Sequence, residues 1–321
     1  MRDAGSTASP EALPDVREAG SHERRGPPLD GFSQFSFADG DIEHVVYHTG
    51  RRSDPVVLVL HELPGIAPGL LQFAGRLVAD GFQVYLPWMF GGVQRRTPLR
   101  NFARLCISRE FANLRAGVSA PVTQWLRALV SHVSRHNDDR PVGAIGMCVT
   151  GGFAIPLLLS PHVTVAVAAQ PSIPVSLAWF AFGRGDADGQ SALNVSQADI
   201  DAARARLDAG DAQLLAVRCA ADRMCPPRKL ERFRAEFPAG LTLQTYGAET
   251  DRNVQGERPH ATYTKEYRLA AETQATAEHP ARQAYAELLA FLRQGLAGPV
   301  APVDARPVEV EHDGGSTGSR A

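Results

Sequence analysis

Short, continuous apolar runs alternate with helical patterns along most of this chain. Residues 55–60, 142–145 and 163–169 are typical of strands that are buried on both faces. Apolar residues in 70–78 recur at helical spacing instead, and Asp80-Gly81 ends that pattern. The same criteria predict further strands at 82–86, 214–217 and 241–246, and helices at 111–136 (with a kink or restart at Pro121), 153–159, 196–207, 229–237 and 281–296.

This alternation predicts an α/β fold with a mostly parallel central sheet and helices on both faces. Residues 35–37 and 42–48 alternate between apolar and polar positions, which is typical of antiparallel edge strands. We expect one domain over residues 29–297, because no repeat or low-complexity linker interrupts it. The segments 1–28 and 298–321 are rich in small, polar and charged residues and are expected to be disordered tails.

Composition narrows the class of protein. A hydrophobic content of 44% is enough for a sizeable core, and a net charge of -2 gives no reason to expect nucleic acid or a membrane as a partner. Four cysteines without a C-x-x-C pair do not indicate a disulfide framework or a zinc ribbon. No apolar signal segment is found near Met1, so a cytoplasmic protein is expected.

The stretch with the clearest chemistry runs from 141 to 155. A buried strand is followed by Gly146, Cys148, Gly151 and Gly152, and then by a second apolar run. Small residues on both sides allow a sharp turn that lifts one side chain above the sheet, as in a nucleophile elbow. The alternative is an inert cysteine buried in the core, but the flanking glycines favour a thiol nucleophile at the start of a helix.

A thiol nucleophile needs a base and a carboxylate that orients the base. Cys148, Asp222 and His260 occur in the order nucleophile, acid, histidine, which is the order found in α/β-hydrolases. Asp222 and His260 both follow predicted strands, so all three should meet at the carboxyl edge of the sheet. Asp251 is a weaker candidate for the acid, and His279 is interpreted as a residue at the start of the last helix.

Four pieces of sequence together resemble the dienelactone hydrolase family. They are residues 61–65 (His-Glu-Leu-Pro-Gly), 146–152 (Gly-Met-Cys-Val-Thr-Gly-Gly), 221–226 (Ala-Asp-Arg-Met-Cys-Pro) and His260. The resemblance covers about residues 30–297 and implies the α/β-hydrolase fold. It also implies that Cys148 is the nucleophile, Asp222 the orienting acid and His260 the base.

The same resemblance implies three further roles. Glu62 matches a glutamate that in relatives contacts the thiol and helps to control its ionisation. The backbone N–H groups of Leu63 and Val149 would form the oxyanion hole, so their side chains should matter little. Like Asp222 and His260, Glu62 follows a predicted strand.

The chain departs from the family at two places. Thr150 stands where many members have glycine, which suggests an altered pocket. The loop after residue 86 brings Trp88 and Phe90 near the strand, whereas Arg95 and Arg96 lie further along and are expected at the surface. Trp88 and Phe90 could form an apolar pocket wall, and core packing is the alternative role for both.

The sequence therefore predicts a hydrolase that opens a lactone or small carboxylic ester through an acyl-cysteine. A non-catalytic binding or scaffold protein and an acyltransferase remain alternatives. No histidine follows His61-Glu62 at the zinc-protease position, and no phosphate-binding glycine motif is present, so neither a metal nor a cofactor is expected. The expected partner is a small-molecule ester or lactone, and the oligomeric state is not predicted.

Overall fold

The structure is a computed structural model that describes residues 25–93, 121–172, 191–193 and 195–297. Residues 1–24 of the predicted N-terminal tail and the whole predicted C-terminal tail lie outside the described residues. So do most of the loop after Trp88, with Arg95 and Arg96, and residues 111–120 of the helix expected at 111–136. The segment 170–195 is described only in part.

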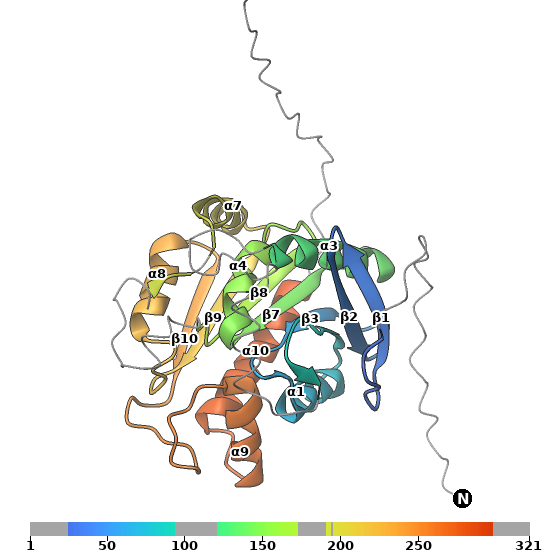
Figure 1. Ribbon diagram of the computed structural model, residues 1–321. Coiled ribbons are helices and arrows are strands. Elements are labelled where there is room, and N and C mark those ends of the chain that lie inside the picture. The colour runs from blue at the N-terminus through green and yellow to red at the C-terminus, as the bar shows by residue number, and fades with distance from the viewer. Residues whose placement is uncertain (1–24, 94–120, 173–190, 194, 298–321) are drawn as a thin grey trace, which may run out of the picture.

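An eight-stranded sheet forms the centre of the described part of the chain, in the order β1-β2-β5-β3-β7-β8-β9-β10. β1 and β2 pair antiparallel, as do β2 and β5, and the remaining neighbours are parallel. The bounds are β1 Ser33–Asp39, β2 Ile42–Thr49, β3 Val56–Leu60, β5 Gln83–Pro87, β7 Val142–Met147, β8 Val163–Ala169, β9 Gln213–Cys219 and β10 Leu241–Tyr246. Figure 1 shows β1 and β2 at one edge of the molecule and β10 at the other.

Helices cover both faces of this sheet, because the central strands bury apolar side chains on both sides. In β3, Val56, Leu58 and Leu60 belong to one apolar cluster, whereas Val57 and Val59 belong to the other. Side chains from α3, α4, α7 and α8 pack in the first cluster, and those from α1 and α10 pack in the second. The bounds are α1 Pro68–Ala79, α3 Val122–His136, α4 Ala154–Leu157, α7 Gln197–Asp208, α8 Pro227–Glu236 and α10 Pro280–Leu296. The predicted fold class is confirmed.

Local signals place several helix starts correctly. The Ser196 hydroxyl accepts a hydrogen bond from Asp199 N at 3.1 Å and caps α7. Pro226 and Pro227 open α8, as expected for residues that have no N–H to lose. After the elbow, however, a 3-10 helix (η2, Cys148–Phe153) precedes a short α4, so helical structure begins earlier than the apolar pattern indicated.

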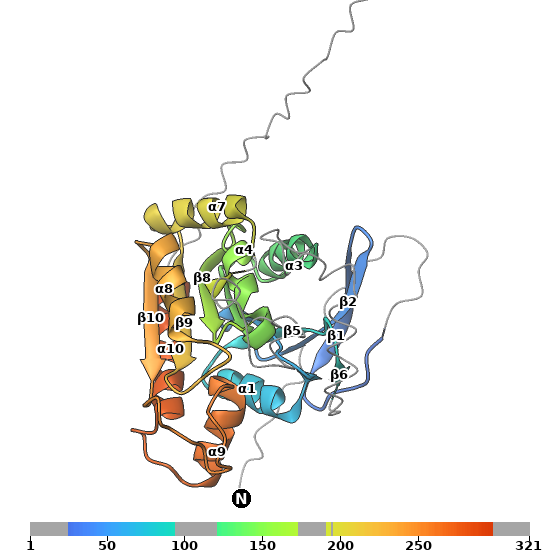
Figure 2. The same cartoon turned by 60° about the vertical axis from the view of Figure 1, so that its left-hand side comes forward.

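Two features were not predicted. A two-residue sheet pairs β4 (Gly65–Ile66) with β6 (Gly92–Val93). A π-helix (η3, Thr262–Glu266) and α9 (Tyr267–Glu272) follow His260. Figures 1 and 2 both place α9 beside α1, which joins segments far apart in the sequence. No helix in the described ranges combines the length and apolar character that a membrane span requires.

Candidate active site

Cys148 lies on a tight turn between β7 and η2 and adopts a left-handed backbone conformation, with φ at 52°. For a residue with a Cβ this conformation costs roughly 1–2 kcal/mol, so the surroundings must hold it in place. A Cβ on Gly146 would lie 2.2 Å from the Thr150 carbonyl oxygen, and one on Gly151 would lie 2.7 Å from Pro171 Cα. Both glycines are therefore required by close backbone approach, as the sequence pattern predicted.

The Thr150 hydroxyl ties this turn to the ends of two strands. Its Oγ1 accepts a hydrogen bond from Met147 N at 2.9 Å and lies within donating distance of Met147 O (2.9 Å) and Leu60 O (3.3 Å). Thr150 is fully buried. The departure from glycine at this position thus adds a side-chain brace between β3, β7 and the elbow.

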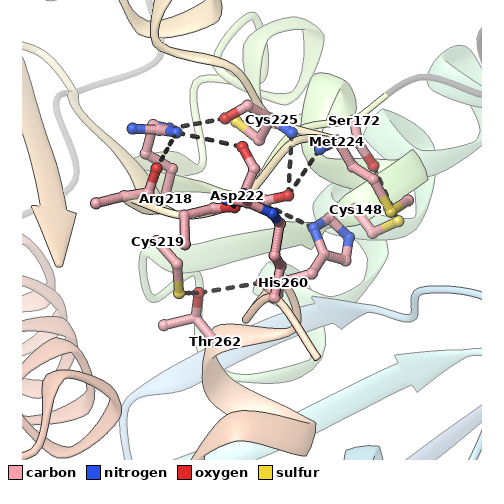
Figure 3. A network of polar contacts seen from close by, with 12 residues as sticks. Cys148, Ser172, Arg218, Cys219, Asp222, Met224, Cys225, His260 and Thr262 are labelled. Carbon is pink, nitrogen blue, oxygen red and sulfur yellow. Dashed lines mark hydrogen bonds and ion pairs between the residues drawn. The ribbon is translucent and has the colours of Figure 1, made fainter. Parts of the chain in front are cut away.

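The thiol of Cys148 has a close polar neighbour in Ser172, just beyond the end of β8 (Figure 3). Cys148 Sγ and Ser172 Oγ are 3.0 Å apart, and Ser172 N donates to Cys148 O at 3.0 Å. Both residues are buried. Sequence reasoning missed Ser172, although its place after a strand was a usable signal.

Asp222 and His260 form a directed pair at the same edge of the sheet. His260 Nδ1 and Asp222 Oδ2 are 2.7 Å apart, and only 1% of the aspartate side chain is exposed. The other carboxylate oxygen, Oδ1, accepts hydrogen bonds from Met224 N at 2.8 Å and Cys225 N at 3.3 Å. These backbone donors fix the carboxylate, which in turn fixes the imidazole (Figure 3).

The loop that carries Asp222 is braced by a buried guanidinium. Arg218 Nε donates to Cys225 O at 2.7 Å, and Nη2 donates to Ala220 O at 2.8 Å and Asp222 O at 3.2 Å. Arg218 extends from β9, so it links the strand to the turn that follows (Figure 3). Sequence reasoning did not identify this residue.

The electrostatic surroundings of His260 make its imidazole a stronger base than a free histidine side chain. Burial alone lowers the pKa of this imidazole, but the negative charge of Asp222, the nearby Cys148 and the hydrogen bond to Asp222 raise it well above 6.5. Since Nδ1 is bound to Asp222, Nε2 is the nitrogen available for proton transfer. Nε2 is buried and has no hydrogen-bond partner among the described residues.

Glu62 completes the group, as its place after β3 predicted. One ligand-capable atom from each of Glu62, Cys148 and His260 can be chosen so that all lie within 4.8 Å of one another. The Thr264 hydroxyl donates to Glu62 Oε1 at 2.5 Å. Burial raises the pKa of the Glu62 carboxyl, and the Thr264 bond and the His260 charge partly oppose the rise. Thr264 lies in the π-helix η3, which no pattern in the sequence predicted.

His61, next to Glu62, has a structural role. It is 1% exposed, its Nε2 accepts from Met89 N at 3.1 Å, and its ring centroid lies 4.2 Å from that of Phe90. Burial lowers the pKa of His61 to about 4, so its ring is neutral at pH 7. Phe90 packs on the same face of the sheet as Cys148, whereas Trp88 packs against the other apolar cluster. A pocket-wall role for either aromatic residue stays a prediction.

The remaining candidates occupy structural positions. His279 caps α10, with Nδ1 accepting from Ala281 N at 3.2 Å, and Asp251 Oδ2 accepts from Ala248 N at 2.7 Å within a turn. Cys219 Sγ lies 3.4 Å from Thr262 Oγ1, and burial raises the pKa of that thiol to about 11. Burial also raises the pKa of the Cys225 thiol. Cys219 and Cys225 are therefore poor nucleophiles at neutral pH.

The sheet order, the elbow and the position of the acid and histidine after the later strands define an α/β-hydrolase fold. Residues 42–179 match the model of the dienelactone hydrolase family, which confirms the predicted resemblance to that family and supports an ester hydrolase. No curated protein matches the chain significantly by sequence.

Solved structures agree on the fold. A Klebsiella pneumoniae protein described as a dienelactone hydrolase is 17% identical, covers 82% of this chain and 98% of its own, and has a TM-score of 0.56. A Pyrococcus furiosus esterase is 12% identical, with coverages of 83% and 93% and a TM-score of 0.53. A cold-adapted esterase from an Arctic intertidal metagenomic library is 15% identical, with coverages of 87% and 100% and a TM-score of 0.50.

Proposed function

We propose that this protein hydrolyses small carboxylic esters, including lactones, through an acyl-cysteine formed on Cys148. The observation that carries the proposal is the pairing of His260 Nδ1 with the buried carboxylate of Asp222 at 2.7 Å. This bond leaves Nε2 free on the side of the nucleophile, within the group that includes Cys148 Sγ. The arrangement is that of a base held in one orientation by an acid.

The first half of the reaction transfers the acyl group to sulfur. His260 Nε2 takes the proton of Cys148, and the thiolate attacks the carbonyl carbon of the ester. The negative charge that develops on the carbonyl oxygen is stabilised by the backbone N–H groups of Leu63 and Val149. The tetrahedral species then expels the alkoxide, which leaves as an alcohol with the proton from His260.

The second half regenerates the thiol. His260 removes a proton from water, the resulting hydroxide attacks the thioester carbonyl, and the same two N–H groups hold the oxyanion. The carbon–sulfur bond breaks, the carboxylic acid leaves, and the proton on His260 returns to Cys148. In a lactone both halves of the substrate belong to one molecule, so the alcohol stays attached to the acyl group until water attacks.

Glu62 is proposed to restrain the thiol before substrate binds. A carboxylate this close to sulfur disfavours a second negative charge, and His260 opposes that effect. The Thr264 hydroxyl orients the carboxyl group. The partner that we expect is a small-molecule ester. A cytoplasmic location and a single domain over residues 29–297 stay predictions.

A panel of aryl esters and lactones tests this function against the alternatives. Wild type should hydrolyse part of the panel, and Cys148→Ala should hydrolyse none while remaining folded. Product ratios with and without added alcohols separate hydrolysis from acyl transfer, because an acyltransferase would form new esters in preference to acid. A protein that binds panel members but turns none over would be a binding protein.

A further inference from the structure

We infer that Glu62, Cys148 and His260 form an inhibitory binding site for a zinc ion. The site is assembled from three elements of the fold: the loop after β3, the elbow after β7 and the loop after β10. The three side chains offer a carboxylate oxygen, a sulfur and an imidazole nitrogen, with the chosen atoms no more than 4.8 Å apart. In the described residues no other group of three such side chains comes together this closely.

The separation of these atoms suits one small cation. Around a tetrahedral zinc ion, with bonds of about 2.0–2.3 Å, neighbouring ligand atoms lie roughly 3.3–3.6 Å apart. The ligand atoms must therefore approach one another by up to about 1.5 Å, which rotation about side-chain bonds can supply. A water molecule would fill the fourth position.

Each ligand already has a second partner that orients it. Asp222 holds His260 through Nδ1 and so presents Nε2, the arrangement of a carboxylate–histidine–zinc site. Thr264 holds one oxygen of Glu62, and Ser172 contacts the sulfur of Cys148. Nε2 of the histidine is buried without a hydrogen-bond partner among the described residues, and coordination would satisfy it.

Charge and ligand type favour zinc over the harder divalent cations. A thiolate and a carboxylate together carry two negative charges, which one Zn²⁺ neutralises. Sulfur and imidazole select zinc or cobalt, whereas Mg²⁺ and Ca²⁺ prefer sites made of oxygen alone. Zinc binds the thiolate of Cys148, the neutral imidazole of His260 and the carboxylate of Glu62, so the protons that these three groups hold are released to the buffer.

Inhibition is the consequence that rests on the proposed function. The bound ion would occupy the electron pairs of Cys148 Sγ and His260 Nε2, the two atoms that attack the ester and move the proton. Hydrolysis should therefore stop when zinc binds and resume when a chelator removes it. The fold would thus carry a metal-sensitive control on the same side chains that perform the reaction.

Cobalt is the probe that tests the site without measuring activity. Chelator-treated full-length protein is titrated with Co²⁺, and we expect one ion per chain with a thiolate-to-cobalt charge-transfer band and the visible bands of a tetrahedral ion. Zn²⁺ should remove both. Cys148→Ser should lose the charge-transfer band, and Asp222→Asn should weaken binding about 10–100-fold. His279→Asn, which keeps the cap on α10, is the matched control and should bind as wild type does.

Three outcomes would overturn the site, and the first two are absence of the charge-transfer band in folded wild type and a band that persists in Cys148→Ser. The third is a Cys219→Ala variant that loses the band, which would show that the ion binds Cys219 and not Cys148. These failures are separate from failure of the proposed function. Ester hydrolysis that depends on Cys148 but ignores Zn²⁺ rejects only the metal site, whereas cobalt binding without ester hydrolysis rejects only the function.

Discussion

Replacing Thr150 by valine tests whether its hydroxyl holds the elbow in its strained conformation. The substitution keeps the shape of the side chain and removes the acceptor for Met147 N and the donor toward Leu60 O. A buried N–H left without a partner costs about 1–3 kcal/mol. We therefore expect the free energy of unfolding to fall by about 1–3 kcal/mol, which is roughly a fivefold to 150-fold change in the unfolding equilibrium.

The same substitution should affect catalysis through the position of Cys148, the proposed nucleophile. Cys148 is held at φ 52°, and a turn released from the brace can relax toward an unstrained conformation. A displacement of about 1 Å at a reacting atom costs on the order of a hundredfold in rate, so kcat should fall about ten- to a hundredfold with a smaller change in KM.

Urea unfolding and steady-state kinetics on one ester measure both effects of Thr150→Val. Thr150→Ser is the matched control, because it keeps the hydroxyl and loses only a methyl group. Serine should retain most of the turnover that valine loses. If the valine variant is as stable and as active as wild type, the hydroxyl does not brace the elbow.

Three further predictions concern histidines and Glu62. His260→Ala should lower turnover by several orders of magnitude, whereas His279→Ala should cost only about 1 kcal/mol of stability by removing a helix cap; kinetics and unfolding distinguish the two. Burial, aided by a neighbouring histidine, lowers the pKa of His48 from 6.5 to about 4. Because the folded protein holds His48 in its neutral form, the contribution of this residue to stability is complete above pH 6.5 and is lost as the pH falls toward 4. Between pH 7 and 5 the free energy of unfolding should therefore drop by about 2 kcal/mol more in wild type than in His48→Phe. Equal pH slopes would show that the histidine is not buried as described. Glu62→Gln should speed alkylation of the Cys148 thiol by iodoacetamide, and an unchanged rate would leave this glutamate a structural role.

The sequence was most informative where one local rule determines the structure. β10 has the bounds that its apolar pattern predicted, and the glycines around Cys148 correctly indicated a tight turn. Residues at strand ends could be placed on one edge because parallel strands end together. That rule alone predicts that Glu62, Asp222 and His260 lie near the elbow.

Other parts depend on contacts between distant segments. The π-helix that carries Thr264 follows no helical pattern, and Arg76 Nη2 from α1 donates to Tyr263 O in that same element. Ser172 and Arg218 act through polar contacts that composition cannot reveal. Thr150 departs from the glycine that many family members have at this position. Only the hydrogen bonds of its hydroxyl explain why a side chain larger than that of glycine fits there.

Detection of the acyl-enzyme tests the central claim most directly. The protein is mixed with an activated aryl ester, quenched in acid after short intervals, and studied by intact mass and peptide mapping. We predict that the acyl group forms on Cys148 with the burst of aryl alcohol, and that both disappear in Cys148→Ala. An acyl group on Ser172, whose hydroxyl lies 3.0 Å from the sulfur, or a burst that persists in the alanine variant would contradict the account.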